Sequence, residues 1–190
     1  MILETQRLIL RPWRDTDAES LYEYAKDDRI GPVTGWPVHT SVENSRDVIR
    51  NVLAVPETYA VCLREDDPST GTAADTPVGC ISLMCGQGSN IGLPDDEGEL
   101  GFWIGVPFWG RGLIPEAARA LIRHAFLDCG LTTLWCGYFD GNEKSRRAQE
   151  KCGFVYHHTN RDIYWRMLDK TVTEHVSRLT RGDWDSGKSE

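Results

Sequence analysis

The chain has 190 residues, of which 40% are hydrophobic and 26% are charged, and its formal net charge is −8. This size and composition are typical of one soluble globular domain with a substantial core. The negative charge argues against a nucleic-acid backbone as the main partner, whereas it is compatible with a cationic or amine substrate. No apolar run is long enough to span a membrane, and the N-terminus lacks the pattern of a secretory signal.

The first third of the chain predicts one strand and two helices. Residues 7–13 are typical of a strand that Pro12 ends. Asp15 is expected to cap a helix that runs to about Lys26. The glycines and prolines of residues 31–37 indicate a loop, and a second helix is expected to begin near residues 40–43 and to continue to 53.

Two further strands are expected over residues 59–63 and 78–84. Between them, residues 65–77 are rich in Asp, Pro, Ser, Thr and Gly, which predicts a mobile hairpin loop. Residues 86–98 form another polar, glycine-containing connection before the central part of the chain.

Residues 99–121 predict a strand, a glycine-bearing turn and a helix. Residues 100–106 are apolar, aromatic and β-branched, and two glycines in Trp109-Gly-Arg-Gly112 allow a tight turn. Pro115 suits the first position of a helix, and the apolar residues that follow recur at helical spacing. Free backbone N–H groups at residues 110–114 and the helix dipole would converge on one anion site, to which Arg111 could add charge.

The last third continues with a strand over residues 133–139, a short helix capped by Asn142, and a strand that opens at residues 153–156. A last strand is expected over 171–180, before a flexible tail at 183–190. The sequence therefore predicts a mixed α+β fold of about seven strands and four helices, with one parallel crossover through a helix.

Four motifs follow one another in a fixed order. They are Glu99-Leu-Gly-Phe-Trp-Ile, Trp109-Gly-Arg-Gly-Leu-Ile-Pro-Glu-Ala, Asn142-Glu-Lys-Ser145 and Glu150-Lys-Cys-Gly-Phe154. Their order and spacing resemble the GNAT superfamily of acetyl-CoA-dependent N-acetyltransferases, and more narrowly its RimJ/RimL-type branch. The resemblance implies one acetyltransferase domain over residues 1–182, with a mostly antiparallel sheet splayed between two central parallel strands.

The resemblance also implies a site for acetyl-CoA. The turn would bind the pyrophosphate, the strand end would pair with the pantetheine arm, and two residues of the next helix would lie near the sulfur. The residues concerned are Gly110, Arg111, Gly112, Leu113 and Ile114 in the turn, Ile104, Gly105 and Val106 at the strand end, and Asn142 and Ser145.

Acetyl transfer to an amine needs a base, because only the neutral amine attacks. Glu99 is the first candidate, directly or through a water, and the alternative is a solvated or salt-bridged strand-end carboxylate. Ser145 is the candidate acid for the leaving thiolate, and its alternative role is a hydrogen bond at the start of the short helix. Gln149 stands where many family members carry a tyrosine acid, and it cannot serve as one.

Trp36 and His39 are expected on the acceptor side of this site, although Trp36 could equally anchor its loop onto the core. The favoured acceptor is a protein N-terminal amine, with small amines left open. The alternative function is a coenzyme-A-binding module or sensor without turnover. The resemblance makes a homodimer plausible.

The six cysteines and five histidines lack the spacing of metal ligands, so we expect no metal site. Most of the cysteines lie in apolar runs, which is typical of reduced, buried thiols in a cytoplasmic protein.

Overall fold

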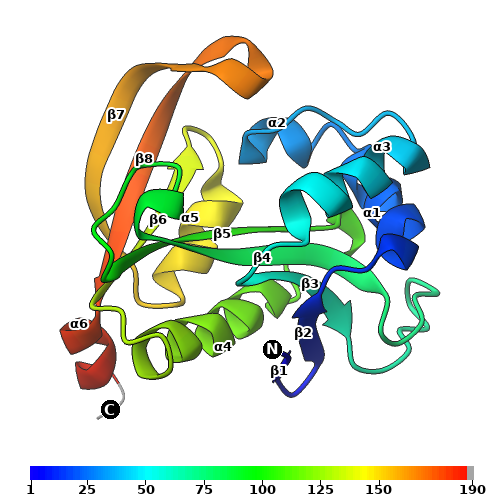
Figure 1. Ribbon diagram of the computed structural model, residues 1–190, viewed down its shortest axis with the longest axis horizontal. Coiled ribbons are helices and arrows are strands. Elements are labelled where there is room, and N and C mark those ends of the chain that lie inside the picture. The colour runs from blue at the N-terminus through cyan, green and yellow to red at the C-terminus, as the bar shows by residue number, and fades with distance from the viewer. Residues whose placement is uncertain (188–190) are drawn as a thin grey trace. The chain divides into compact units, whose positions relative to one another are not determined.

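The computed structural model describes residues 1–187 of the chain (Figure 1). Its strands are β1 (Leu3–Glu4), β2 (Leu8–Pro12), β3 (Thr58–Leu63), β4 (Pro77–Cys85), β5 (Glu97–Ile104), β6 (Thr133–Phe139), β7 (Val155–Trp165) and β8 (Lys170–Thr180). Its α-helices are α1 (Ala18–Ala25), α2 (Gly31–Thr34), α3 (Val42–Val48), α4 (Leu113–Leu127), α5 (Glu143–Glu150) and α6 (Arg181–Ser186). None of the helices in residues 1–187 has both the length and the apolar character needed to cross a membrane.

Hydrogen-bonded neighbours give the strand order β1-β2-β3-β4-β5-β6-β8-β7. The pairing of β5 with β6 is parallel, and the other pairs of known register are antiparallel. Because α4 lies between β5 and β6 in the sequence, the predicted parallel crossover through a helix is confirmed. The mixed α/β fold with a mostly antiparallel sheet is confirmed as well, with eight strands and six α-helices over residues 1–187 in place of the expected seven and four.

The chain divides into two compact units, which are described separately. Unit 1 comprises Met1–Ser82 and Phe102–Ala120. In it, β1 to β3 and the first part of β4 pair in sequence order, and α1 packs against α3 (Figure 1). Ala18, Leu21 and Ala25 of α1 join the buried cluster that includes Ala60 and Cys62 of β3.

A buried ion-pair network lies in the same unit. Arg11 of β2 is 2% exposed, and its guanidinium donates to both carboxylate oxygens of Asp17 at 2.8 and 2.9 Å. Asp17 is itself buried, and Asp75 of the β3–β4 connection accepts from the Nε of Arg11 at 2.6 Å. One arginine thereby ties β2 to the start of α1 and to the end of a loop that the sequence predicted to be mobile.

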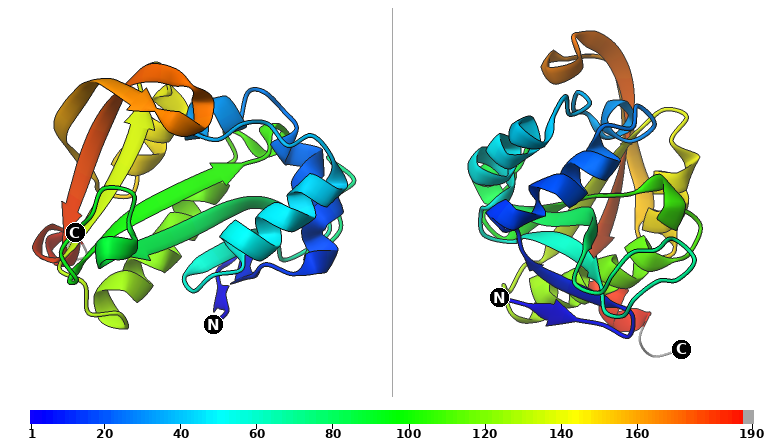
Figure 2. Two further views of the ribbon diagram at one scale, coloured as in Figure 1. Left: turned by 45° about the horizontal axis from the view of Figure 1, so that its top comes forward. Right: turned by 90° about the vertical axis from the view of Figure 1, so that its right-hand side faces the viewer.

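Unit 2 comprises Leu83–Gly101 and Leu121–Glu190. Within it, β6 pairs along its whole length with β8, and β8 pairs in turn with β7. The hairpin formed by β7 and β8 is long, and it appears in orange and red in both views of Figure 2. Its register shifts between Tyr156 and His158 and again between Asn160 and Ile163, which bends the hairpin.

Several local predictions are wrong in detail. The 31–37 loop contains the single turn α2, and Ser41 caps α3 by accepting from the N–H of Asn44. Residues 49–53 continue as a π-helix. Of the predicted tail, residues 183–186 belong to α6, whereas residues 188–190 lie outside the described part of the chain.

The expectation that the cysteines are buried holds for half of them. Cys62, Cys80 and Cys136 are buried, Cys152 is half-buried, and Cys85 and Cys129 are exposed. All six are free thiols, as the sequence predicted. Burial raises the pKa of the Cys62 and Cys80 thiols to about 12, so both are inert at neutral pH.

Candidate functional site

The turn that the sequence singled out lies in unit 1. Gly110 and Gly112 have φ angles of +74° and +73°, which L-residues with a side chain rarely adopt. Helix α4 begins at Leu113, so the prediction that Pro115 is its first residue is wrong. Pro115 occupies the third position, where a backbone N–H has no acceptor within the helix. The N–H of Glu116 donates to the carbonyl of Gly112 at 3.2 Å, so the N–H groups that precede it have no acceptor within the helix. The strand, turn and helix predicted to form an anion site are therefore present.

A substitution at Gly110 tests this turn. A Cβ at this position would have open space around it, so the cost of Gly110→Ala comes only from the positive φ angle. We expect the free energy of unfolding to fall by about 1–2 kcal/mol. Gly88→Ala is the matched control, because Gly88 also has open space but no positive φ, and its effect should stay within about 0.5 kcal/mol. Equal effects of the two substitutions in urea unfolding would contradict the turn geometry.

The side chain of Arg111 is already engaged beside this turn. Its guanidinium pairs with the carboxylate of Asp67 and lies over the ring of Phe108, 5.5 Å from the centroid. The hydroxyl of Ser69 and Arg111 donate to Asp67, and these bonds hold the pKa of that carboxyl well below its usual range. Asp67 thereby anchors the 65–77 loop to the turn.

A cavity of about 420 Å³ opens beside Arg111. Its lining includes Arg7, Arg64 and the acidic run 65–67. Arg7 is paired with Glu116 at 2.6 Å, and Arg64 with Glu4 at 3.4 Å. The positive charge of this cavity is therefore largely compensated within the protein.

The end of β5 is fixed on two sides within unit 1. The N–H of Gly105 donates to the carbonyl of Val78 in β4 at 2.7 Å, and the indole N–H of Trp109 donates to the carbonyl of Ile104 at 3.0 Å. Since backbone groups alternate between the two edges of a strand, the N–H of Ile104 faces the edge opposite β4. At the end of the strand, the N–H of Gly105 is therefore bonded to β4, whereas the N–H of Ile104 points to the opposite edge.

The two residues expected on the acceptor side also lie in unit 1. The Trp36 ring contacts His39 and the ring of Trp103, with centroid distances of 5.3 and 5.7 Å. His39 is buried, its Nδ1 lies 2.8 Å from the hydroxyl of Ser45, and burial lowers its pKa. The imidazole is therefore neutral at physiological pH and held by a hydrogen bond. Trp103 directly precedes Ile104, so Trp36 lies close to the strand end.

In unit 2, the parallel pairing of β5 with β6 is short. It joins Glu97, Gly98 and Glu99 to Thr133, Leu134 and Trp135, and it does not continue to Gly101 and Gly137. Glu99 is the last residue of β5 that pairs with β6. The splay that the resemblance implied between these two strands is therefore seen at Glu99 and Trp135.

The Glu99 carboxylate is held by one residue. The backbone N–H of Asn90 donates to Oε2 at 2.8 Å, and the Asn90 amide donates to Oε1 at 3.2 Å. No cationic side chain pairs with Glu99 anywhere in residues 1–187. Burial raises the pKa of Glu99, the nearby charge of Glu174 adds to this, and the Asn90 bonds oppose it. Glu99 is therefore half-buried and does not form a salt bridge within residues 1–187.

Glu174 was missed in the sequence. The register pairs Glu174 of β8 with Phe139 of β6, and Phe139 lies on the same strand face as Gly137, Trp135 and the paired Glu99. A Cβ on Gly137 would lie 2.5 Å from the Glu174 Oε1, so the glycine leaves room for this carboxylate. No local pattern marks Glu174, because its position depends on the pairing of strands far apart in the sequence.

Helix α5 begins close to β6. Its N-cap is Asn142, whose side chain accepts from the N–H of Ser145 at 3.2 Å, so the predicted cap is confirmed. The Gln149 amide donates to the Ser145 hydroxyl oxygen and to the carbonyl of Gly137, both at 3.2 Å. The structure therefore brings Ser145 and Gln149 together beside Gly137 of β6.

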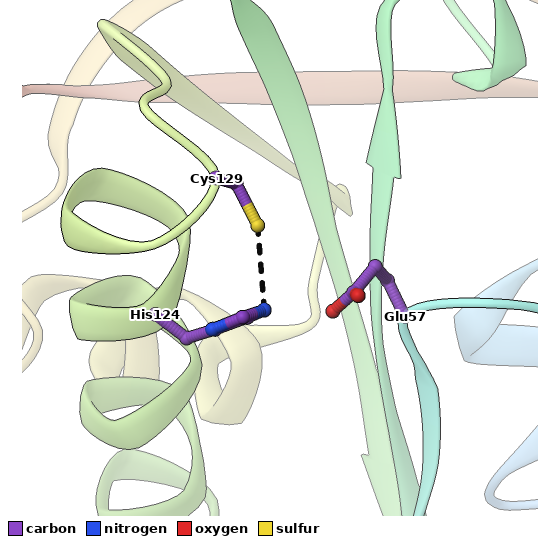
Figure 3. A group of neighbouring side chains, drawn as sticks. All are labelled: Glu57, His124 and Cys129. Atoms are coloured by element: carbon purple, nitrogen blue, oxygen red, sulfur yellow. Dashed lines mark hydrogen bonds between the residues drawn. The ribbon is translucent and has the colours of Figure 1, made fainter. Parts of the chain in front are cut away.

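His124 of α4 is a buried histidine whose ring is held by its neighbours. It is 3% exposed, its Nδ1 lies 2.8 Å from a carboxylate oxygen of Asp128, and its Nε2 lies 3.3 Å from the Cys129 sulfur (Figure 3). Both ring nitrogens are used to hold the end of α4 and the residues that follow it. His175 is held similarly, between Asp140 at 3.0 Å and Thr159 at 2.8 Å.

Comparison with known proteins identifies the family. Residues 7–155 match the model of the acetyltransferase (GNAT) domain. The chain belongs to the GNAT acetyltransferase family. A curated relative, "Putative ribosomal N-acetyltransferase YdaF" of Bacillus subtilis (strain 168), is 37% identical over 160 residues, which cover 83% of this chain and 82% of the relative. The resemblance recognised in the sequence is thereby confirmed.

Solved structures confirm the GNAT fold. A GNAT-family acetyltransferase from Bacillus anthracis has a TM-score of 0.77 at 19% identity, over 95% of this chain and 98% of that one. The microcin C7 self-immunity acetyltransferase MccE, solved in complex with acetyl-CoA and AMP, has a TM-score of 0.72 at 16% identity, over 93% of each chain. The family match and the curated relatives together show that the protein is an N-acetyltransferase. Its family uses acetyl-CoA.

Proposed function

We propose that this GNAT protein moves the acetyl group of acetyl-CoA directly to a primary amine, with a protein N-terminal amine as the favoured acceptor. The observation that carries the proposal is the Glu99 carboxylate, which is half-buried, raised in pKa and without a cationic partner in residues 1–187. It lies at the last paired position of β5, where β5 and β6 separate. A base at this position would remove the proton of an ammonium group before or during attack.

The pKa of Glu99 also bears on which amine is used. A protein α-amine has a pKa of about 7.7–8.0, whereas a lysine amine has a pKa of about 10.4. Proton transfer to a carboxylate is therefore easier from the α-amine by about 2.5 pKa units. The name of the Bacillus subtilis relative, "Putative ribosomal N-acetyltransferase YdaF", supports a protein acceptor and the RimJ/RimL-like branch.

The chemistry proceeds without a covalent enzyme intermediate. The amine nitrogen forms a bond to the thioester carbonyl carbon, its proton passes to Glu99 or to a water held there, and the carbon–sulfur bond of the tetrahedral intermediate breaks. The outward N–H of Ile104 would stabilise the oxyanion, because a fixed donor needs no reorganisation during the reaction. The Ser145 hydroxyl would donate a hydrogen bond to the leaving sulfur.

The remaining roles follow the strand–turn–helix. The turn from Gly110 to Ile114 would bind the pyrophosphate through backbone N–H groups, as helix N-termini commonly bind phosphates. Ile104 to Val106 would pair with the pantetheine arm, with Asn142 beside it. Trp36 and His39 would line the acceptor side, since Trp36 contacts the residue before Ile104. We further propose that residues 1–182 act as one cytoplasmic domain without a metal, and a homodimer is the assembly that the family resemblance implies.

The proposal is tested by unfolding and turnover together. Acetyl-CoA at about 100 times its Kd should stabilise the protein by about 2.7 kcal/mol, because it binds only the native state. Thiol release should then appear with peptides that carry a free α-amine and be absent when the same peptides are N-terminally blocked. Stabilisation without release from any peptide, lysine or small amine would favour a coenzyme-A sensor. The absence of stabilisation would overturn the proposed site.

A further inference from the structure

Gln149 is a buried polar side chain that the proposed mechanism leaves without a role. It lies on α5 and is 2% exposed, and the family resemblance places it where many members carry a tyrosine. Its Nε2 makes two hydrogen bonds, whereas its Oε1 has no partner in residues 1–187. A buried carbonyl oxygen without a partner is costly. The two hydrogen bonds that Nε2 donates must therefore hold the amide in this orientation.

The two acceptors fix the direction of the amide. The carbonyl of Gly137 can only accept, so the group 3.2 Å from it must be the amide NH₂ and not the amide oxygen. The second N–H of the same NH₂ then points to the Ser145 hydroxyl oxygen at 3.2 Å. The flipped amide would place an oxygen against the Gly137 carbonyl, where the two partial negative charges repel.

This orientation determines what the Ser145 hydroxyl does. A hydroxyl has one donor and two acceptor sites. One acceptor site of Ser145 is filled by Gln149, and its own O–H has no acceptor within residues 1–187. The hydroxyl is therefore held as a hydrogen-bond donor. Donation by Gln149 into the oxygen also polarises the O–H and makes it a better donor.

We infer that Gln149 is a positioning residue, which bridges Gly137 and Ser145 and directs the Ser145 hydroxyl hydrogen at the departing sulfur of the thioester. This inference rests on the proposed function. As the carbon–sulfur bond breaks, the sulfur takes the bonding electron pair, and the hydrogen bond from Ser145 stabilises the new negative charge. A serine hydroxyl is less acidic than a thiol, so its proton stays on Ser145, and solvent supplies the proton of the free thiol.

The bridge also explains how this chain functions without a tyrosine. A thiolate with a pKa of about 8.5 is a tolerable leaving group, so it needs a well-placed hydrogen bond more than a strong acid. Gln149, which stands at the position of the tyrosine acid, lies one helical turn from the smaller donor Ser145 and orients its hydroxyl.

The test compares single-turnover rates of acetyl transfer at saturating acetyl-CoA, because these isolate chemistry from product release. Gln149→Met keeps the side-chain volume and removes both N–H donors. Ser145→Ala removes the hydroxyl, and a double variant carries both changes. Glu150→Ala is the matched control. Glu150 is the exposed neighbour of Gln149 on α5, and it forms an ion pair with Arg146 on the same helix.

We expect Gln149→Met and Ser145→Ala each to slow transfer by about tenfold, which is modest for loss of a donor because the thiolate leaves readily. The double variant should be no slower than Ser145→Ala, since both changes remove one hydrogen bond. The affinity for acetyl-CoA and the rate of Glu150→Ala should match those of the wild type. Gln149→Glu should slow transfer as much as Ser145→Ala, because a carboxylate would accept the Ser145 hydrogen. This variant tests the positioning role if Gln149→Met does not fold.

A Gln149→Met rate within about twofold of the wild type, or losses that multiply in the double variant, would overturn the positioning role. These outcomes presuppose a wild-type protein that transfers acetyl. A wild type that binds acetyl-CoA but acetylates no amine would instead refute the proposed function, and the role of Gln149 in transfer would fall with it. The two failures are therefore distinguishable in one set of measurements.

Discussion

Glu99→Gln is expected to lower kcat/KM for an amine acceptor by about 10²–10⁴-fold at neutral pH, the range that a positioned general base contributes. The substitution keeps the shape of the side chain and leaves an oxygen to accept from Asn90, so the affinity for acetyl-CoA should stay the same. The matched control is Glu97→Gln, because Glu97 lies two residues earlier on the same strand and its carboxylate accepts from the indole of Trp135. Equal losses in both variants would contradict the assignment of the base.

The pH dependence of the wild type follows from the same group. Burial raises the pKa of Glu99, so kcat/KM should fall as the pH drops through a value above that of an ordinary glutamate. This acid limb should vanish in Glu99→Gln. An acid limb that persists unchanged in the variant would show that another group titrates.

Glu99→Gln, although less active than the wild type, should be at least as stable at neutral pH. A carboxyl whose pKa is raised by folding favours the folded state below its unfolded pKa, and this contribution is lost as the pH rises through the folded pKa. At neutral pH the wild type therefore bears the cost of a charged, half-buried carboxylate. Glu99→Gln should have an equal or higher Tm at neutral pH, and the difference should close as the pH is lowered.

Arg11→Met is expected to have the largest effect on folding, about 3–5 kcal/mol off the free energy of unfolding, because it leaves Asp17 buried without its partner. Combining it with Asp17→Leu should recover most of this loss, since the unpaired charge is then gone as well. Arg14→Met is the control, because Arg14 is exposed and its pair with Asp75 should be worth about 1 kcal/mol or less. Equal losses in the free energy of urea unfolding for Arg11→Met and Arg14→Met would refute the role of the buried pair.

The sequence predicted most reliably those features that depend on neighbouring residues. The bounds of β6 agree with the predicted strand, and the Asn142 cap and the two glycines of the turn are as expected. Each follows from the chemistry of a few adjacent residues. The buried face of α4 was likewise predicted, because Ala118, Leu121, Ile122 and Ala125 recur at helical spacing and all are buried.

The predictions that failed depend on partners distant in the sequence. Residues 183–186 of the predicted tail belong to α6, because Thr180 caps this helix and Trp184 packs on Phe126, 5.2 Å away between ring centroids. Four aromatic residues of the apolar segments predicted as strands are only half-buried: Phe102, Trp103, Trp135 and Phe139. An aromatic side chain on a strand does not reveal whether the other side of the sheet is covered.

The candidate site shows the same division. Glu99, Ser145 and the turn could be named because the family motifs contain them. Glu174 and the bridging role of Gln149 could not, because one requires the register of β6 with β8 and the other requires the approach of α5 to Gly137. The engagement of Arg111 by Asp67 was also hidden, since 44 residues separate them.

The central claim is best tested by the product itself. A short peptide with a free α-amine and one internal lysine is incubated with the protein and acetyl-CoA, and fragment masses locate the added acetyl group. The account predicts one acetyl group on the α-amine, formed by the wild type and largely lost in Glu99→Gln. An unmodified peptide, together with unmodified small amines, under conditions where acetyl-CoA raises the Tm would contradict it.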